Sequence, residues 1–419
     1  MYKALTVLLL LTLVLTLGCG GAKEETKTFT GMPDLILAQA QFHNETGDDG
    51  EEKPVPGAAR LMLVYKTPSG WDYEVLEDEQ SNVFHKGVPF VRNGQTGILT
   101  LGANKAILKF WTRQEGKWTA EVLYQGSYGG ENDRLRDIEI GDVNGDGKDN
   151  IVLATHDQGI VLVLDEKDGK WETTEIDKHK DTFVHEIELG DVDNDGIFEI
   201  FSTPSEPNKL DGTVQPGLIP MYDYKNGEYV RSIVEEFPTR HVKEILCADI
   251  DSDNQPELYC ALEAEMEEVA KGGGSVQIKK YDFDDGKIND QVIMELPDML
   301  CRFLTVGDVD GDGNKEMVVA PLSSGVWLFR YDKGKWTKEL IDKNSSSFEH
   351  ATVISDLNGD SKNEIYIAAD DQGFLNKYEW NGSEFVKETL VPIEGDILTF
   401  GVIPGKMETY KITEELRIG

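Results

Sequence analysis

The chain has 419 residues and carries 41 Lys and Arg residues against 78 Asp and Glu residues, a formal net charge of −37. This excess of carboxylates excludes a nucleic-acid-binding protein, because binding to phosphates requires clustered cations. Hydrophobic residues make up 39% of the chain, which is enough for a folded core and excludes wholesale disorder. The carboxylates must therefore be dispersed over a folded protein or bind cations.

The first predicted element is an export signal. A short basic start is followed by an apolar run from Ala4 to Leu17, which is typical of a secretory signal peptide over residues 1–18. Thr16-Leu17-Gly18-Cys19 resembles the lipobox of prokaryotic lipoproteins, although that family usually has Leu where Thr16 stands. The resemblance implies that Cys19 is lipidated and that residues 19–33 tether the protein to membrane lipid on the extracellular face of the cell envelope. Ordinary cleavage nearby is the alternative.

Two groups of strands follow the tether. Residues 35–41, 60–66 and 71–77 have the apolar and β-branched composition of strands. The next unit, residues 82–124, has four predicted strands, and its first two are joined by the short turn Arg92-Asn93-Gly94-Gln95. This turn has no acidic residue, so we expect no metal there.

From residue 134 onward an acidic loop recurs five times. The first aspartates of successive loops are 49, 58, 59 and 48 residues apart, and an apolar strand follows each loop. Each loop has oxygen-bearing side chains at positions 1, 3, 5 and 9. These are Asp142, Asn144, Asp146 and Asn150; Asp191, Asp193, Asp195 and Glu199; Asp249, Asp251, Asp253 and Glu257; Asp308, Asp310, Asp312 and Glu316; and Asp356, Asn358, Asp360 and Glu364.

Oxygen ligands converging in a tight loop suit calcium, a hard cation that takes six to eight oxygens. The bidentate Glu that an EF-hand has at position 12 is absent, since Leu153 and Val319 stand there in two of the loops, and a strand follows instead of a helix. The loops resemble FG-GAP/VCBS-type repeats, the calcium-binding blades of β-propellers such as the integrin α-subunit head. This resemblance implies up to five Ca²⁺ ions at the residues given above. Acidic turns without metal are the alternative. The loops that begin at 142 and 356 have fewer acids and should bind more weakly.

The repeat unit predicts an all-β fold, a seven-bladed β-propeller of four-stranded antiparallel blades in a single domain over residues 34–419. Residues 397–403 form a lone first strand, which completes the three strands near the N-terminus and closes the ring. One blade is thus shared by residues 34–80 and 395–419, and six or eight blades are the alternatives. The other blades are about 82–124, 134–177, 183–236, 241–297, 300–342 and 349–391.

One face of this propeller is the candidate for ligand binding. Three insertions, at residues 43–58, 204–220 and 263–275, fall in the loops between second and third strands, on the face opposite the acidic loops.

Basic side chains and histidines recur at the start of the first, innermost strand of successive blades. They are His85, Lys86, Arg136, His185, Lys243, Arg302 and His350. We hypothesise that they form a ring that binds an anionic group such as a uronate, carboxylate or phosphate. The alternative is that each pairs with a local carboxylate.

Evidence for catalysis is thin, because the chain has no Ser-His-Asp elbow, Walker loop, zinc spacing or dinucleotide-binding turn. His156-Asp157 and Asp370-Asp371 are acid–base candidates, which we interpret as turn residues. The sequence therefore favours a calcium-dependent binding or scaffolding protein at the cell surface, whose partner is an extracellular protein or an acidic glycan. The alternative is an enzyme, since some propellers of this type resemble polysaccharide lyases that act on acidic glycans at the channel mouth.

The sequence leaves the state of the cysteines open. Cys247 and Cys260 flank a predicted hairpin turn and could form a disulfide in an exported protein, while Cys301 would remain unpaired. Three buried free thiols are the alternative.

Overall fold

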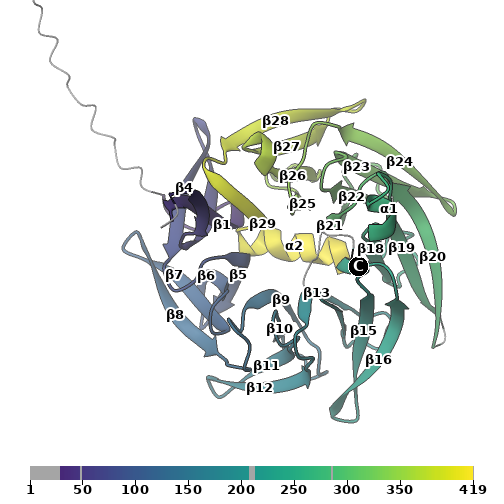
Figure 1. The fold of residues 1–419 in the computed structure, drawn as a ribbon, viewed down its shortest axis with the longest axis horizontal. Helices are drawn as coiled ribbons and strands as arrows, with labels where there is room; N and C mark the ends of the chain where they lie inside the picture. Colours follow the sequence, from purple (N-terminus) through teal and green to yellow (C-terminus); the bar gives the residue numbers. More distant parts are fainter. Residues whose placement is uncertain (1–28, 48–49, 207–212, 285, 419) are drawn as a thin grey trace, which may run out of the picture.

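The computed structural model describes residues 29–47, 50–206, 213–284 and 286–418. Seven antiparallel sheets stand around a central axis like the blades of a propeller, each with four strands from the axis outward (Figure 1), and one sheet has a short fifth strand, β2 (Glu52–Pro56). The predicted all-β, seven-bladed architecture is therefore confirmed. Within the described residues, no helix has the length and apolar character needed to cross a bilayer.

We number the blades along the chain and name their strands A to D from the axis outward. Blade 1 consists of β29 (Asp396–Pro404), β1 (Leu35–Thr46), β3 (Ala59–Thr67) and β4 (Gly70–Asp78). Blade 2 consists of β5 (Phe84–Arg92), β6 (Gln95–Gly102), β7 (Ile107–Gln114) and β8 (Lys117–Gln125). Blade 3 consists of β9 (Leu135–Gly141), β10 (Asn150–Thr155), β11 (Val161–Lys167) and β12 (Lys170–Asp177). Blade 4 consists of β13 (Phe183–Gly190), β14 (Glu199–Ser205), β15 (Gly217–Lys225) and β16 (Glu228–Phe237).

The remaining blades have the same strand order. Blade 5 consists of β17 (Val242–Ala248), β18 (Glu257–Leu262), β19 (Val276–Asp284) and β20 (Lys287–Leu296). Blade 6 consists of β21 (Cys301–Gly307), β22 (Glu316–Pro321), β23 (Val326–Asp332) and β24 (Lys335–Asp342). Blade 7 consists of β25 (Thr352–Ser355), β26 (Glu364–Ala369), β27 (Phe374–Trp380) and β28 (Phe385–Pro392), with a 3₁₀ turn, η1 (Asp370–Gln372), after β26.

The two ends of the chain close the ring in blade 1. Strand β29 pairs antiparallel with β1, from Leu35 opposite Pro404 to Phe42 opposite Asp396. This pairing gives β1 a partner on each side, because β3 lies along its other edge. The inner edge of β1 is thereby covered, which is the reason for sharing a blade between the termini.

The core lies between the blades. Every residue of the B strands β10, β18 and β26 is buried, whereas the D strands β8 and β12 are mostly exposed. Between blades 5 and 6, for example, Tyr259 packs against Trp336, with ring centroids 6.0 Å apart. Cys247, Cys260 and Cys301 are all buried and free, so no disulfide joins the first two.

Chain direction assigns the loops to two faces. The A–B loops and C–D turns lie on one face, the loop face, and the B–C loops and D–A links lie on the other, the insertion face. The first insertion continues β1 and returns as β2 (Glu52–Pro56), and the third contains α1 (Met266–Val269). Arg240, in the preceding D–A link, donates hydrogen bonds to the carbonyl oxygens of Glu263 (3.2 Å) and Ser275 (2.9 Å), which ties the third insertion to the insertion face.

A C-terminal helix, α2 (Met407–Ile418), was not predicted from the sequence. It follows β29 and lies across the middle of the ring (yellow in Figure 1), in contact with the A strands β5, β17, β21 and β25. Lys406 Nζ pairs with Asp34 Oδ1 at 2.5 Å, and Thr413 Oγ1 donates a hydrogen bond to Ser355 Oγ at 3.0 Å. Because Asp34 and Ser355 border A–B loops, α2 lies at the loop-face end of the channel.

Candidate functional site

The five acidic A–B loops share one backbone conformation. The first aspartate accepts a hydrogen bond from the N–H of the sixth residue in every loop, at 2.7 Å from Gly147, 3.0 Å from Gly196, 3.1 Å from Asn254, 2.9 Å from Gly313 and 2.8 Å from Ser361. The fourth and sixth residues of all five loops have positive φ, including Asn254 (φ 69°) and Ser361 (φ 68°), where the sequence lacks glycine. The repeated turn is therefore kept even where its backbone is unfavourable for a side chain.

The ninth loop residue is buried behind this turn. It accepts a hydrogen bond from the backbone N–H of the second loop residue, at 3.2 Å in Asn150, 2.9 Å in Glu199, 3.4 Å in Glu257, 3.0 Å in Glu316 and 3.4 Å in Glu364. The exposed fraction of these five residues is at most 3%. A buried residue begins each B strand and points its oxygens at the acidic turn, so strand and loop together form the site.

Carboxylates converge in four of the five loops. Within each group, one oxygen of each carboxylate lies within 4.8 Å of the others. The groups are Asp191, Asp193 and Glu199; Asp249, Asp251 and Glu257; Asp308, Asp310 and Glu316; and Asp356, Asp360 and Glu364. The loop at 142 has Asn144 and Asn150 in place of two acids, so its two carboxylates, Asp142 and Asp146, form no such group among the described residues.

Electrostatics in these groups favour a bound cation. Burial, followed by the negative charge of Asp193, raises the pKa of Glu199 to about 8. Burial likewise raises the pKa of Glu316 to about 8 and that of Glu257 to about 7. A crowded all-oxygen donor set of this kind fits a hard divalent cation such as Ca²⁺ in the loops at 191, 308 and 356. In the 249–257 loop the Lys280 ammonium lies 2.9 Å from Asp251 Oδ2 and 2.8 Å from Glu257 Oε1, so this group already holds a cation.

The cations predicted to line the channel mouth are surrounded by carboxylates. Arg302 Nη1 lies 2.6 Å from Glu349 Oε1, and Arg302 Nε lies 3.6 Å from Glu263 Oε1. Arg136 lies 3.6 Å from the other oxygen of Glu349. Lys243 is buried, and its pKa is lowered to about 7 by burial, against the opposing effect of Glu263. Arg302 therefore pairs with carboxylates next to it on blades 5 and 7, whereas Arg136 of blade 3 reaches Glu349 beside blade 7.

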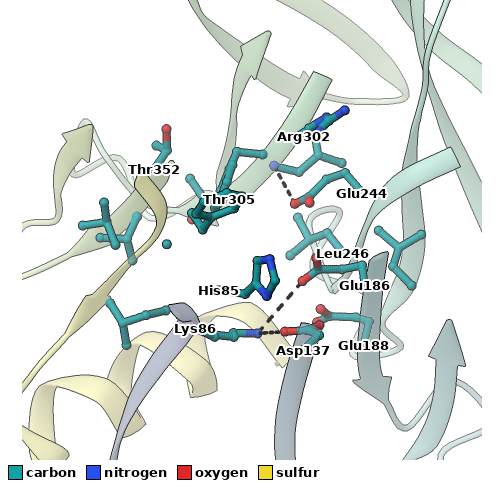
Figure 2. Close-up of a pocket in the computed structure, with 18 of the residues that line it drawn as sticks. His85, Lys86, Asp137, Glu186, Glu188, Glu244, Leu246, Arg302, Thr305 and Thr352 are labelled. Carbon is teal, nitrogen blue, oxygen red and sulfur yellow. Dashed lines mark hydrogen bonds and ion pairs between the residues drawn. The ribbon is translucent and has the colours of Figure 1, made fainter. Parts of the chain in front are cut away.

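A cavity of about 90 Å³ lies deeper in the channel. Figure 2 shows Lys86 pointing toward Asp137 and Glu186, with Glu244 above Glu186 in this view. Lys86 Nζ is 3.0 Å from Asp137 Oδ1 and 4.0 Å from Glu186 Oε1. Of the seven predicted ring residues, those that line this cavity are His85, Lys86, Arg136 and Arg302. The carboxyl groups of Asp137, Glu186, Glu188 and Glu244 line the cavity beside them, and burial raises the pKa of Glu244 to about 8.

The predicted histidines have different surroundings. His350 is fully buried; its Nδ1–H donates to the carbonyl oxygen of Pro321 at 2.7 Å, and its Nε2 accepts from Ser345 Oγ at 2.8 Å. His185 packs edge-on against His156, with ring centroids 4.9 Å apart. His156 stacks on Phe183 at 4.2 Å, and neither of its ring nitrogens has a hydrogen-bond partner.

The two acid–base candidates have structural contacts. Asp157 Oδ2 accepts the backbone N–H groups of Asn132 (3.0 Å) and Asp133 (3.1 Å). Asp370 accepts the N–H and the hydroxyl of Thr399 at 2.7 and 2.8 Å. These aspartates hold their turns against neighbouring segments of the chain.

Comparison with known proteins supports the repeat and the fold. Residues 142–202 match the FG-GAP-like repeat family model. Among solved structures, the chain is similar to a hypothetical selenium-binding protein from Sulfolobus tokodaii, with a TM-score of 0.56 and 12% identity over 91% of this chain and 96% of that one. A mutant of AofleA from Arthrobotrys oligospora matches with a TM-score of 0.41 and 13% identity over 76% of this chain and 89% of that one, a similarity too low to carry an argument. Among curated proteins none matches.

Proposed function

We propose that this propeller, which contains an FG-GAP-like repeat, is an exported, lipid-anchored protein that holds calcium in its A–B loops and binds a protein partner through its insertion face. The observation that carries the proposal is the recurrence of convergent carboxylate groups, each with a buried glutamate, at one place in successive blades. Chance acidic turns would not repeat a buried carboxylate, because burying an uncompensated charge is costly.

The loops at 191, 308 and 356 carry the residues that would hold the ion. In each, the first and ninth residues are carboxylates that accept backbone N–H groups of the loop, and three carboxylates have oxygens within 4.8 Å of one another. A bound Ca²⁺ would neutralise the repulsion within each group. The loop would then be joined to the start of its B strand, so the metal would stabilise the blades and keep their register.

The contacts of Phe29 indicate which face of the propeller the proposed anchor would hold toward the membrane. Phe29 stacks on Tyr65 near the C–D turn of blade 1, with ring centroids 4.5 Å apart, and its carbonyl oxygen accepts a hydrogen bond from Arg113 at 3.0 Å. Both contacts are on the loop face. Cys19 lies outside the described residues, ten positions before Phe29, a stretch that spans at most about 35 Å. A lipid on Cys19 would hold the loop face toward the membrane and turn the insertion face outward.

The channel favours a binding role over catalysis. A lyase acting on an acidic glycan would need cations free to bind the substrate's carboxylates. Here Arg302 and Arg136 share Glu349, and Lys86 is paired with Asp137 and Glu139. We therefore assign the insertions, rather than the channel, to the docking of a partner.

Cell fractionation of the full chain and the Cys19→Ser variant tests the anchor. We expect the wild type in the membrane fraction and the variant in the soluble exported fraction, and equal membrane association of both would contradict lipidation.

Cross-linking on intact cells tests the docking face. Shortening residues 264–274 to a two-residue turn should remove specific cross-links without lowering the melting temperature in calcium. Unchanged cross-links after shortening this loop and the β1–β2 hairpin would contradict the proposed face.

A further inference from the structure

A lysine side chain lies inside one of the acidic loops. Lys280, on β19 of blade 5, places its ammonium nitrogen 2.9 Å from Asp251 Oδ2, 2.8 Å from Glu257 Oε1 and 2.9 Å from Asp282 Oδ1. Asp251 and Glu257 occupy positions 3 and 9 of the loop, and Asp282 lies two residues further along β19. The ammonium therefore touches two of the three carboxylates that form the group in this loop.

Every N–H donor of the Lys280 ammonium has a carboxylate partner. A lysine ammonium has three N–H donors, and here three carboxylates from the loop, strand B and strand C each lie within hydrogen-bond distance. The Lys280 side chain is only 9% exposed, so these contacts are shielded from water. A cation that is held by oxygen ligands at this point fills the role that a metal ion has in the other loops.

No other loop among the described blades has this arrangement. Lys280 stands opposite Tyr259, two residues after loop position 9. The residues at the same register in the other blades with acidic loops are Val163, Met221, Leu328 and Lys377. The first three are apolar. Lys377 pairs with Glu379 and Glu388, both at 2.9 Å, on strands C and D of its own blade.

The 308–316 loop offers an informative contrast. Arg330 approaches it from β23, but among the loop carboxylates it pairs with Asp310 alone, at 3.2 Å, and its other nitrogen pairs with Glu339 at 2.7 Å. Asp308 and Glu316 instead accept backbone N–H groups of their own loop, from Gly311, Gly313 and Val309. Arg330 thus contacts one carboxylate at the edge of its loop, whereas Lys280 contacts two of the three carboxylates that form the group in the 249–257 loop.

We propose that Lys280 replaces the metal ion in the 249–257 loop, so that this loop binds no calcium in the wild-type protein while other acidic loops do. The inference rests on the proposed calcium function of those loops. It divides the blades into two kinds. Blade 5 is held by an internal ion pair that a chelator cannot remove, and the blades with open acidic groups are held by exchangeable metal.

Counting bound Ca²⁺ by native mass spectrometry and isothermal titration calorimetry tests this on the full mature chain. Lys280→Met should bind one more Ca²⁺ per chain than the wild type. Lys279→Met is the matched control, because the adjacent Lys279 pairs with Glu235 and with Asp290 (2.8 Å), outside the loop, and its count should equal that of the wild type.

A second pair of variants keeps the test decisive if Lys280→Met does not fold. Asp251→Asn should leave the number of bound Ca²⁺ unchanged, whereas Asp310→Asn should lower it by one or weaken that site at least tenfold. A loss of one Ca²⁺ in Asp251→Asn, or no gain in a folded Lys280→Met, would overturn the role of Lys280. Absence of calcium binding in the wild type is a different result, since it would overturn the proposed function itself.

Discussion

Glu199 Oε2 accepts a hydrogen bond of 2.9 Å from the backbone N–H of Val192, the residue that follows the first aspartate of its loop. This bond closes the loop on the start of strand β14 and fixes a buried carboxylate beside Asp191 and Asp193. The same bond recurs in all five acidic A–B loops. Under the proposed function, a loop without a cation costs stability because like charges lie close together, and cation binding would restore that stability.

Replacing Glu199 with Gln separates these two effects. In saturating calcium the variant should lose the stabilisation from one site, about 2.7 kcal/mol if calcium is present at 100 times its Kd. In chelator the variant should be as stable as the wild type or more stable, because burial raises the pKa of Glu199 to about 8 and Gln carries no charge there. Urea unfolding with and without calcium measures both values. Glu228→Gln, on an exposed strand, is the control, and an equal loss for Glu199→Gln in both conditions would contradict a metal role.

Removing Arg302 tests whether the channel cations are structural. The guanidinium is buried and pairs with Glu349 at 2.6 Å, so Arg302→Met leaves this buried carboxylate with only the longer contact to Arg136, at 3.6 Å. We expect a loss of about 3–5 kcal/mol in the free energy of unfolding. The double variant with Glu349→Gln should be less destabilised than the sum of the single changes. A stable Arg302→Met protein that loses binding to a uronate-containing glycan would instead support the anion-binding ring.

His156 should make stability depend on pH. Burial, then the nearby His85 and Arg136, keeps its pKa well below the ordinary value of 6.5. The unfolded chain therefore binds a proton that the folded chain does not, and this residue lowers stability as the pH falls below 6.5. Relative to the wild type, His156→Phe should gain about 2 kcal/mol between pH 7.5 and pH 5. Denaturant unfolding at both pH values measures this, and an equal difference at the two values would show that His156 has the same pKa in the folded and unfolded chain.

The left-handed backbone of Ser361 predicts a stabilising substitution. Its φ of 68° is unfavourable for a residue with a Cβ, and its N–H is needed for the hydrogen bond to Asp356. Ser361→Gly should raise stability by about 1 kcal/mol. Ser232→Gly, in the exposed strand β16, should instead lower stability by about 0.5–1 kcal/mol. Thermal unfolding of both variants checks the signs, and a destabilised Ser361→Gly would show that the serine side chain has a role of its own.

Local patterns in the sequence predicted the blades and the loops. The acidic residues of a loop lie within nine positions, and the strand after each is apolar, so the unit can be recognised before its position in space is known. Closure of blade 1 could also be inferred, since Ile397 and its neighbours needed a partner and residues 35–41 lacked an inner strand. These features depend on short-range chemistry or on the requirement that a propeller closes.

Contacts between different blades could not be predicted in this way. Glu349 pairs with Arg302 and Arg136, 47 and 213 positions away, and no spacing rule connects them. A weaker signal was present, because Arg136, His185 and Lys243 are each followed directly by an acid. Lys280 was missed because its register relative to the loop is set by the pairing of β18 with β19. The helix α2 was missed because the chain after Pro404 lacks the apolar periodicity of an independent helix and is held by the channel.

The measurement that tests the central claim most directly is thermal unfolding of the mature protein in calcium, after chelation, and after calcium is restored. The proposed function predicts a substantial fall in melting temperature on chelation, full recovery with Ca²⁺, and a smaller recovery with Mg²⁺, which prefers a more rigid octahedral site. A melting temperature that is unchanged by chelation would contradict the assignment of calcium to the A–B loops.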